Sequence, residues 1–493
     1  MSNAARRAPD APASPRTRLP VSTIARYATG SLGTGGFSTL PGLVLVFYLT
    51  DTLGVGALLA GLLVTLAKIW DVVIDPVIGA LSDRELVRRG NRRRMMVVGA
   101  VALPIFFALT FAVPPALGPS AGAIWVLIAF VLTATAFSLF QVPYIALPAE
   151  LTDSYDARTT LLTWRVVVLT FAILLFGAGG PMLRSVTDDP TLGYLVMGIV
   201  AGVTIGVGML IATGAARHAL ATRPAMQVAG SATAAEAEFV ADEVDGTTSS
   251  TTDASPSAFG TGIRSNYRAA LDALRRSQPF RALLATFVLQ ALATGLMLAG
   301  AQYLATWVLK SEDAVTFLFV ALIAPALFAA PAWAWFARRQ GKERVFAIAS
   351  VLFALAALST VGAVWAPGDW IYVPVAFAGI AYAGMQSLPM AMLPDVIAHD
   401  AQRNGPGRAG AFGGVWTAGE TTGFALGATA LSIVLAATGY VASTADQSVS
   451  QPAAAITGIV VSFSVVPAAL IAVSLLTLAR YRLRKDDIES QAA

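Results

Sequence analysis

Two stretches with one shared pattern decide the fold: Gln141-Val-Pro143-Tyr-Ile-Ala-Leu147-Pro148-Ala-Glu150 and Gln386-Ser-Leu-Pro389-Met-Ala-Met-Leu393-Pro394-Asp395. Both contain Pro-x-x-x-Leu-Pro and then an acid, and both close a long apolar segment. A pattern that recurs in the two halves of one chain indicates an internal repeat. The segments around the two stretches should therefore correspond as well.

Long apolar segments run throughout the chain, which is 56% hydrophobic and 13% charged, with a mean hydropathy of +0.69. A bilayer core requires about 20 apolar residues per helix and leaves no backbone polar group unpaired. Twelve segments satisfy this requirement, and the two stretches fall in the fourth and the tenth. The segments are Ser22–Tyr48, Val55–Leu81, Met95–Val113, Ala121–Ala149, Leu161–Met182, Leu192–Ala215, Phe280–Leu309, Ala314–Phe336, Val345–Trp365, Ile371–Ile397, Ala409–Thr438 and Ala453–Ala479.

Positive charges are concentrated on alternate connections, before the first segment and after the second, eighth and twelfth. They are Arg16, Arg18, Arg84, Arg88, Arg89, Arg92, Arg93, Arg94, Arg338, Arg339, Lys342, Arg344, Arg480, Arg482, Arg484 and Lys485. The other connections carry almost no positive charge, with Arg184 and Lys310 as isolated exceptions. Because basic connections stay in the cytoplasm, the pattern predicts a multi-pass inner (cell) membrane protein with both termini cytoplasmic.

Hydrophobicity collapses between the two halves, where residues 217–278 are rich in Ala, Ser, Thr, Asp and Glu. Such a segment cannot bury enough apolar surface to fold, which predicts a flexible cytoplasmic linker with a short surface helix near its end, at Tyr267–Arg276. The predicted order is a disordered cytoplasmic tail (1–20), a six-helix bundle (21–216), the linker (217–278), a second six-helix bundle (279–480) and a cytoplasmic tail (481–493). This all-α arrangement is that of the major facilitator fold, whose site lies between the halves near the midplane.

The residue inventory argues against an enzyme. There is no cysteine, and the only two histidines are His218 and His399. The sequence contains no paired base and nucleophile, no metal cluster and no nucleotide loop. We predict no cofactor and no nucleic-acid partner, only a small-molecule solute and the lipid bilayer, and a monomer. A membrane-embedded enzyme or sensor is the distant alternative, and a sensor would need a folded soluble domain that the sequence does not indicate.

The second segment holds the densest group of charges. Lys68, Asp71 and Asp75 are three and four residues apart, so they share one face of a helix. Two carboxylates in a membrane helix cost about 2.5–3.5 kcal/mol each unless something compensates them, and one lysine neutralises only one. The remaining charge suits a monovalent cation or a transferable proton. The alternative is an internal salt bridge that only positions helices.

These residues belong to a longer pattern that resembles the glycoside–pentoside–hexuronide:cation symporter family. The resemblance rests on Phe47-Tyr48-Leu49-Thr50-Asp51-Thr-Leu53-Gly54, on Trp70-Asp71-x-x-x-Asp75-Pro76-x-x-Gly79-x-x-x-Asp83-Arg84, on Pro143-Tyr144-x-Ala-Leu147-Pro148-x-Glu150, on Arg158 and Arg165, on Leu388–Asp395 and on Gly413–Gly427. It implies cation-coupled symport of a sugar, glycoside or related small solute, in which the two halves rock about a central site.

By that resemblance, Asp71 and Asp75 bind the coupling ion, Ser138 completes the site and Lys68 competes for one acid. Sodium at Asp71 and Asp75 is the only metal we predict. Ile74 replaces a polar residue often present in the family and offers no oxygen. Two acids one turn apart disfavour simultaneous ionisation, so we favour a proton over sodium.

The predicted solute contacts are Arg165, Gln141, Tyr144, Gln386, Trp416, Glu420 and Thr421. Gly35 and Gln141 stand where the family has sugar-contacting aspartates, and Ile145 stands where it has a stacking tryptophan. This loss keeps a second function open, a lysolipid or amphipathic organic-anion carrier on the same fold. Glu420 can either bind solute or lock two helices together.

A group of residues at the predicted cytoplasmic mouth is assigned to gating: Gly79, Asp83, Arg84, Glu150 and Arg158. Close helix packing, a latch and positive-inside anchoring explain them best. Direct recognition of an anion or a lipid headgroup is the alternative.

Overall fold

The computed structural model describes residues 19–152, 155–217, 274–404, 409–445 and 449–483. Twelve helical spans in this part of the chain are long and apolar enough to cross a membrane, which confirms the predicted all-α fold. The predicted linker lies almost wholly outside the described residues, as do most of both tails.

The helices match the predicted segments, although some, such as those ending at Phe111 and Ala212, end earlier than predicted and one runs eight residues beyond Leu81. In the first half they are α1 (Val21–Thr29), α2 (Ser31–Asp51), α3 (Ala57–Arg89), α4 (Arg93–Phe111), α5 (Pro119–Leu151), α6 (Tyr155–Arg184) and α7 (Pro190–Ala212). In the second half they are α10 (Gln278–Tyr303), α11 (Ala314–Gln340), α12 (Lys342–Ser359), α13 (Tyr372–Asn404), α14 (Ala409–Ala437), α15 (Ala453–Phe463) and α16 (Val465–Leu478), with short turns η1 (Leu304–Val308), η2 (Thr360–Val364) and η3 (Asp369–Ile371). Helices α1 and α2 form the first span, and α15 and α16 form the last.

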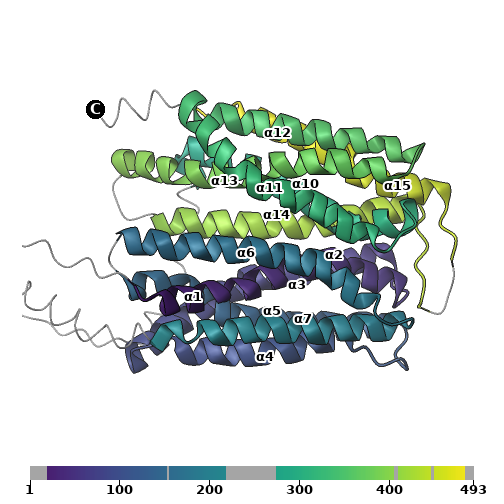
Figure 1. Cartoon of the computed structure of the whole chain (residues 1–493), viewed down its shortest axis with the longest axis horizontal. Coiled ribbons are helices and arrows are strands. Elements are labelled where there is room, and N and C mark those ends of the chain that lie inside the picture. The colour runs from purple at the N-terminus through teal and green to yellow at the C-terminus, as the bar shows by residue number, and fades with distance from the viewer. Residues whose placement is uncertain (1–18, 153–154, 218–273, 405–408, 446–448, 484–493) are drawn as a thin grey trace, which may run out of the picture.

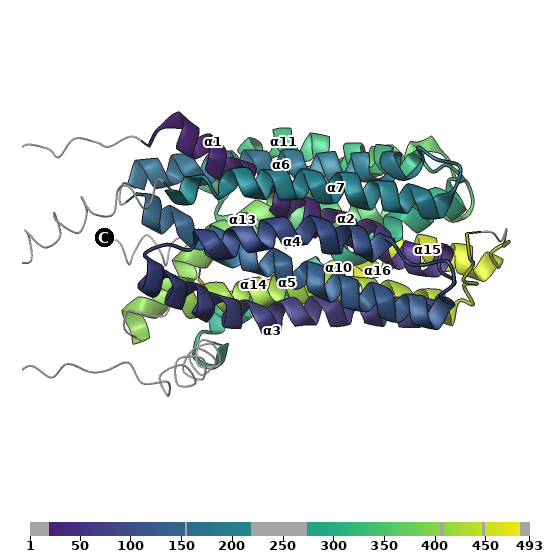
Figure 2. The same cartoon turned by 90° about the horizontal axis from the view of Figure 1, so that it is seen from below.

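The helices pack as two bundles whose axes run along the long direction of the molecule (Figures 1 and 2). In the first bundle α4 packs on α5 and α7, and α2 packs on α6. In the second bundle α10 packs on α14 and α16, and α13 packs on α11 and α12. The bundles meet mainly through three pairs, α3 with α14, α6 with α11 and α2 with α10. A ligand site between the halves would therefore be bordered by α3 and α14.

The acids that close the two repeated stretches make equivalent ion pairs. Glu150, at the end of α5, lies 2.6 Å from Nε of Arg92, just before α4. In the second bundle, Asp395 of α13 lies 2.6 Å from Nζ of Lys342, the first residue of α12. Each acid thus ties the fourth helix of its bundle to the third. The shared sequence pattern corresponds to a shared structural device.

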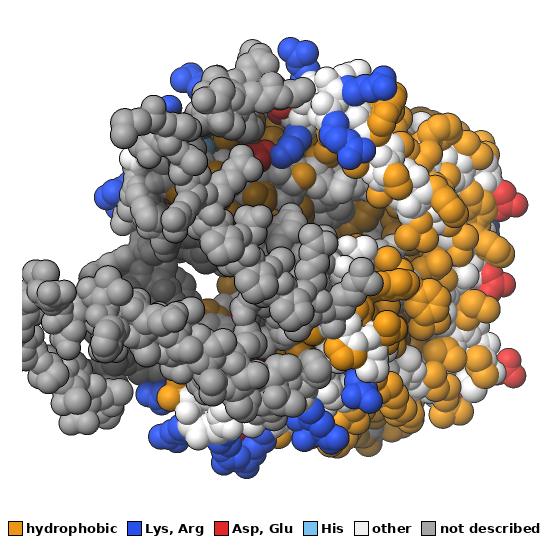
Figure 3. Space-filling view, turned by 60° about the vertical axis from the view of Figure 1, so that its left-hand side comes forward, with side chains coloured by type: hydrophobic (Ala, Val, Ile, Leu, Met, Phe, Trp, Pro, Cys, Tyr) orange, Lys and Arg blue, Asp and Glu red, His pale blue; other side chains and the backbone are white. Residues whose placement is uncertain are grey.

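Basic side chains gather at one end of the molecule, where α3 and α11 finish with Arg88, Arg89, Arg338 and Arg339. Figure 3 shows Lys and Arg side chains around this end, and acidic side chains at the far edge of the view. We call it the basic end and the other one the opposite end. The charge asymmetry that the sequence predicts is therefore present in three dimensions.

Because the chain has no cysteine, single cysteines can test its orientation. Val87 is exposed at the basic end and Ser185 is exposed at the opposite end. We expect Ser185→Cys to react with a membrane-impermeant maleimide on intact cells, and Val87→Cys to react only after permeabilisation, because arginine-rich ends stay in the cytoplasm. Labelling of Val87→Cys in intact cells would reverse the proposed orientation.

Candidate functional site

The predicted coupling residues come together on α3. Nζ of Lys68 lies 3.5 Å from Oδ2 of Asp71. The same ammonium lies 4.3 Å from the ring centre of Phe37 and 5.6 Å from that of Phe130. Aromatic faces attract a cation within about 6 Å, so Lys68 is held by two rings as well as by one carboxylate. This arrangement leaves Asp75 without the direct lysine contact that Asp71 has.

The two carboxylates are enclosed but not fully satisfied. Asp71 is only 7% exposed, and its Oδ1 has no hydrogen-bond partner among the described residues. Asp75 is half-buried, and the hydroxyl of Ser138 on α5 is within hydrogen-bonding reach of it. An unpaired buried carboxylate oxygen is costly, and a monovalent cation or a proton would satisfy it. The donor set fits the coupling ion that the sequence predicts.

A metal ion would need ligands from several side chains. No group of three or more His, Cys, Asp or Glu side chains that could hold a metal ion occurs in the described ranges. The oxygens at Asp71 and Asp75 therefore suit a proton or one weakly held monovalent ion better than a divalent metal.

In the first bundle, polar contacts join α1, α2, α5 and α6. The Gln141 amide oxygen accepts a 2.8 Å hydrogen bond from Thr34. The guanidinium carbon of Arg165, on α6, lies 5.4 Å from the ring centre of Tyr144. Tyr144 itself is fully buried, stacks on Tyr27 and donates a 2.9 Å hydrogen bond to the carbonyl of that residue. In this conformation Tyr144 packs between helices, and its ring contacts the guanidinium of Arg165.

In the second bundle, Glu420 of α14 lies near Tyr382 of α13, whose hydroxyl pairs with Gln386. The exposed side chains of Leu426 and Ile433 mark the lipid face of α14. With about 100° per residue, Glu420 lies more than 100° around the helix from both. The half-buried Glu420 carboxylate is therefore directed away from lipid, toward the interior.

Two further predicted solute contacts lie on the same helix. Trp416 is only 2% exposed and stacks on Phe287, with 4.3 Å between ring centres. Its indole N–H has no hydrogen-bond partner among the described residues. Thr421 is half-buried, and helical spacing places it on the side of α14 where Ala425 and Thr429 meet α3. Gln386, Glu420 and Tyr382 form one cluster, while Trp416 packs against α10 one turn away.

Sequence reasoning did not predict a network that joins the bundles at the opposite end. Asp51, at the end of α2, accepts hydrogen bonds from the Trp307 indole at 3.2 Å and the Tyr440 hydroxyl at 2.6 Å. The neighbouring Thr50 hydroxyl lies 2.6 Å from that of Tyr303. Two adjacent residues of the first bundle thus bind three side chains of the second.

Two more contacts join the bundles at the opposite end. Arg184, at the end of α6, is buried, contacts the Tyr194 hydroxyl at 3.1 Å and pairs with Glu312 of the second bundle at 3.2 Å. The backbone N–H of Ser443 donates to the carbonyl of Thr50 at 2.9 Å. We call these inter-bundle contacts of Thr50, Asp51 and Arg184 the clasp. An isolated arginine at an end otherwise poor in positive charge was the one sequence signal that pointed to it.

The predicted gating residues lie at the basic end. Two of them, Asp83 and Glu150, bind the side chain of Arg92. It is buried and contacts Asp83 at 2.6 Å, Glu150 at 2.6 Å and the Ser82 hydroxyl at 2.7 Å. Arg158 donates to the carbonyl of Thr152 at 3.1 Å. Gly79 lies in α3 and Arg84 is exposed on it. The contacts of Asp83 and Glu150 stay inside the first bundle, and their role in gating remains a prediction.

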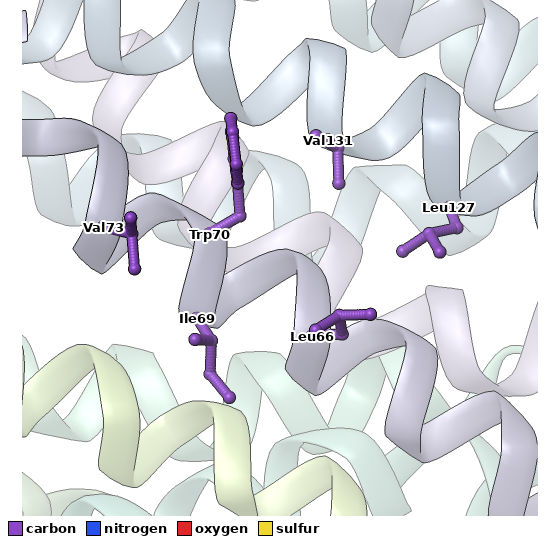
Figure 4. Close-up of a pocket in the computed structure, with 6 residues that line it drawn as sticks. All are labelled: Leu66, Ile69, Trp70, Val73, Leu127 and Val131. Atoms are coloured by element: carbon purple, nitrogen blue, oxygen red, sulfur yellow. The ribbon is translucent and has the colours of Figure 1, made fainter.

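An apolar groove of about 280 Å³ lies between α3 and α5, on the outer surface of the first bundle. Its lining, shown in Figure 4, consists of Leu66, Ile69, Trp70, Val73, Leu127 and Val131. Trp70 donates from its indole N–H to the hydroxyl of Thr135 at 2.9 Å. The four α3 side chains are strongly exposed, so this groove faces the surroundings of the bundle and not the bundle interface.

Comparison with known proteins decides the family. The model of the family described as MFS/sugar transport protein matches residues 26–237 and 246–485. The chain belongs to this family of the major facilitator superfamily. It is therefore a transporter and not an enzyme, and the resemblance to the glycoside–pentoside–hexuronide:cation symporters is confirmed.

Individual matches add detail to the family assignment. The chain is 27% identical to a glucuronide carrier protein homolog of Escherichia coli over 35% of the chain and 38% of that protein. It is 25% identical to sodium-dependent lysophosphatidylcholine symporter 1 of Mus musculus over 72% of the chain and 66% of that protein. The matches with bacterial symporters cover only 30–42% of those relatives.

The solved structures agree on the fold. The xylose transporter XylE of E. coli, in a partially occluded inward open conformation, superposes with a TM-score of 0.58 at 15% identity, covering 94% of this chain and 98% of that one. At this identity the likeness establishes the fold alone. The activity, the solute and the coupling ion of this chain must therefore be argued from its own residues.

The clasp generates a prediction about the opposite end. Removing the Asp51 carboxylate leaves the Trp307 and Tyr440 donors without this acceptor. The loss should destabilise the closed conformation of the opposite end by about 1–3 kcal/mol. In right-side-out vesicles, Asp51→Ala should make a cysteine reporter at Thr65, buried at the α3–α14 contact, react faster with an impermeant maleimide. Asp188→Ala, at an exposed acid of the same end, is the control. Equal reaction rates in the two variants would contradict a closing role for Asp51.

Proposed function

We propose that the chain carries a sugar, glycoside or related small solute across the cell membrane by cation-coupled symport. The observation that carries this proposal is the α3 cluster: of two enclosed carboxylates only Asp71 pairs with Lys68 among the described ion pairs, and its Oδ1 is still without a hydrogen-bond partner. A permanent mismatch of this kind in a membrane helix is expected where a charge must bind and leave. The family to which the chain belongs supports the solute class.

The transport cycle is proposed to be alternating access between the two bundles. The clasp joins the bundles at the opposite end, and Thr65 of α3 donates to the carbonyl of Ala425 on α14 at 2.9 Å in the same half. If the basic end is cytoplasmic, as the positive-inside rule indicates, this conformation is closed to the outside. The solute would be released toward the cytoplasm from it.

The solute is proposed to lie between the half-buried groups of the two bundles. Arg165 and Gln141 would contact it from the first bundle, and Gln386 and Glu420 from the second. Gln141 is already fixed by Thr34, and Gln386 by Tyr382. Amide groups held in place in this way present donors and acceptors to hydroxyl groups at little further loss of entropy.

We infer a proton as the coupling ion. Sodium is best bound by several oxygens, and the two carboxylates with Ser138 supply few, because Lys68 occupies one oxygen of Asp71. A proton needs only one enclosed carboxylate beside a second acid, which is what Asp75 and Asp71 form. The adjacent Ile74 contributes no ligand.

A lysolipid carrier is the second candidate, and two observations favour it. An apolar groove between α3 and α5 opens on the bundle exterior, where acyl chains would lie in a membrane. The mouse lysophosphatidylcholine symporter matches more of this chain than the bacterial symporters do. Against it, the groove lining is apolar and offers no group for a polar headgroup.

Proteoliposome uptake tests both the function and the ion. For the neutral glycoside that stabilises the detergent-solubilised protein most, we expect accumulation driven by an inwardly directed proton gradient and abolished by a protonophore. A sodium gradient at equal pH should drive no more uptake than a potassium gradient. Sodium-driven uptake that resists the protonophore would refute the proton, and uptake of lysophosphatidylcholine without any glycoside would refute the sugar assignment.

A further inference from the structure

Arg165 and Glu420 are opposite charges within the membrane helices, and both lie outside the ion pairs of the described residues. Arg165 lies over the ring of Tyr144 and beside the hydroxyl of Tyr27. The neighbours of Glu420 are Tyr382 and, through it, Gln386. Neither charge is paired with an opposite charge among the side chains that the structure describes. Because unpaired charges at this depth are costly, each is expected to serve a ligand.

The two charges lie at the same level of the molecule. Arg165 is 10 residues from the start of α6 at Tyr155, and Glu420 is 11 residues from the start of α14 at Ala409. Both helices start at the basic end, and about 1.5 Å of rise per residue places each charge roughly 15 Å along its helix. One belongs to each bundle, so a solute held between the bundles meets a cation from one and an anion from the other.

The sum of charges then restricts the solute. The coupling cluster carries one positive charge, on Lys68, and two negative charges, on Asp71 and Asp75. Binding of one monovalent cation brings that cluster to zero. The pair of Arg165 and Glu420 also sums to zero. A cleft loaded with its ion is therefore balanced only when the solute carries no net charge.

We propose that Glu420 selects by charge: it rejects anionic solutes that Arg165 would otherwise attract, and so restricts transport to uncharged polyhydroxylated solutes. Specificity of this kind rests on a repulsive group built against the wrong ligand. In a partly dry cleft, a carboxylate across one sugar ring from another should weaken binding about tenfold or more. A neutral sugar escapes this repulsion, and its hydroxyl groups can donate to Glu420 and accept from Arg165. The inference rests on the proposed function.

The competing explanation is that Glu420 only locks helices together. A lock would hold a donor of a neighbouring helix tightly, whereas the neighbour that the structure gives Glu420 is Tyr382, a tyrosine already paired with Gln386. The Trp416 indole N–H, one turn away on α14, is also unpaired. Unused donor and acceptor capacity on one helix is what a solute site needs. A lock would also leave the preference between neutral and anionic sugars unchanged on mutation.

The test uses matched pairs of sugars that differ only in one charge, methyl β-glucoside with methyl β-glucuronide and methyl β-galactoside with methyl β-galacturonide. Dissociation constants are measured by calorimetry on the full chain in detergent. For at least one pair, the wild type should bind the neutral member at least tenfold more tightly. Glu420→Gln should bring the two members within about threefold. Asp369→Asn, at an exposed acid of the opposite end, should leave the ratio unchanged.

A second variant covers the case in which Glu420→Gln does not fold. Arg165→Gln removes the attraction for the anion and leaves the repulsion, so it should widen the preference for the neutral sugar by threefold or more. Equal binding of both members by the wild type, or an unchanged ratio in either variant, overturns the charge rule but keeps the proposed function. Failure of every sugar to bind the wild type overturns the proposed function and this inference with it.

Discussion

One lysine faces two carboxylates inside a membrane helix, and the rest of the structure is arranged around that mismatch. In water, a surplus carboxylate would cost little. In α3, the low dielectric raises the free energy of a charged carboxylate, and the surrounding residues do not offset this. Phe37 and Phe130 hold Lys68, while Oδ1 of Asp71 has no hydrogen-bond partner. The unpaired oxygen of Asp71 and the enclosed carboxylate of Asp75 therefore support the proposal that the cluster binds an ion reversibly.

The same helix carries the interface between the bundles. Gly61 of α3 allows so close an approach that an added Cβ would overlap the Ser432 side chain of α14. Thr65 bonds to the carbonyl of Ala425, and Asp71 follows less than two turns later. A change in the charge of the cluster thus acts on a helix whose other half is fixed to the second bundle. Coupling between ion binding and bundle rocking requires a shared element of this kind.

Much of the architecture was predictable from sequence, because the bilayer imposes simple rules. Helix length, the absence of strands from the spans and the sidedness of the arginines follow from hydrophobic thickness and charge. The repeated acids were visible too, although only the structure shows that Glu150 and Asp395 bind Arg92 and Lys342. The clasp was not predictable, since Asp51, Trp307 and Tyr440 are far apart in sequence and no sequence pattern pairs them. The burial of Tyr144 and Trp416 likewise depends on how helices rotate about their axes, which hydropathy does not fix.

The central claim is that the surplus charge of α3 couples ion binding to solute movement, and Asp75→Asn tests it most directly because it removes the charge and keeps the volume. The measurement compares gradient-driven accumulation with counterflow, the exchange of labelled for unlabelled solute at equal ion concentrations on both sides, in the same proteoliposomes. The account predicts that Asp75→Asn loses accumulation by at least tenfold while counterflow persists. Accumulation at the wild-type level in that variant would contradict it and place the coupling site elsewhere.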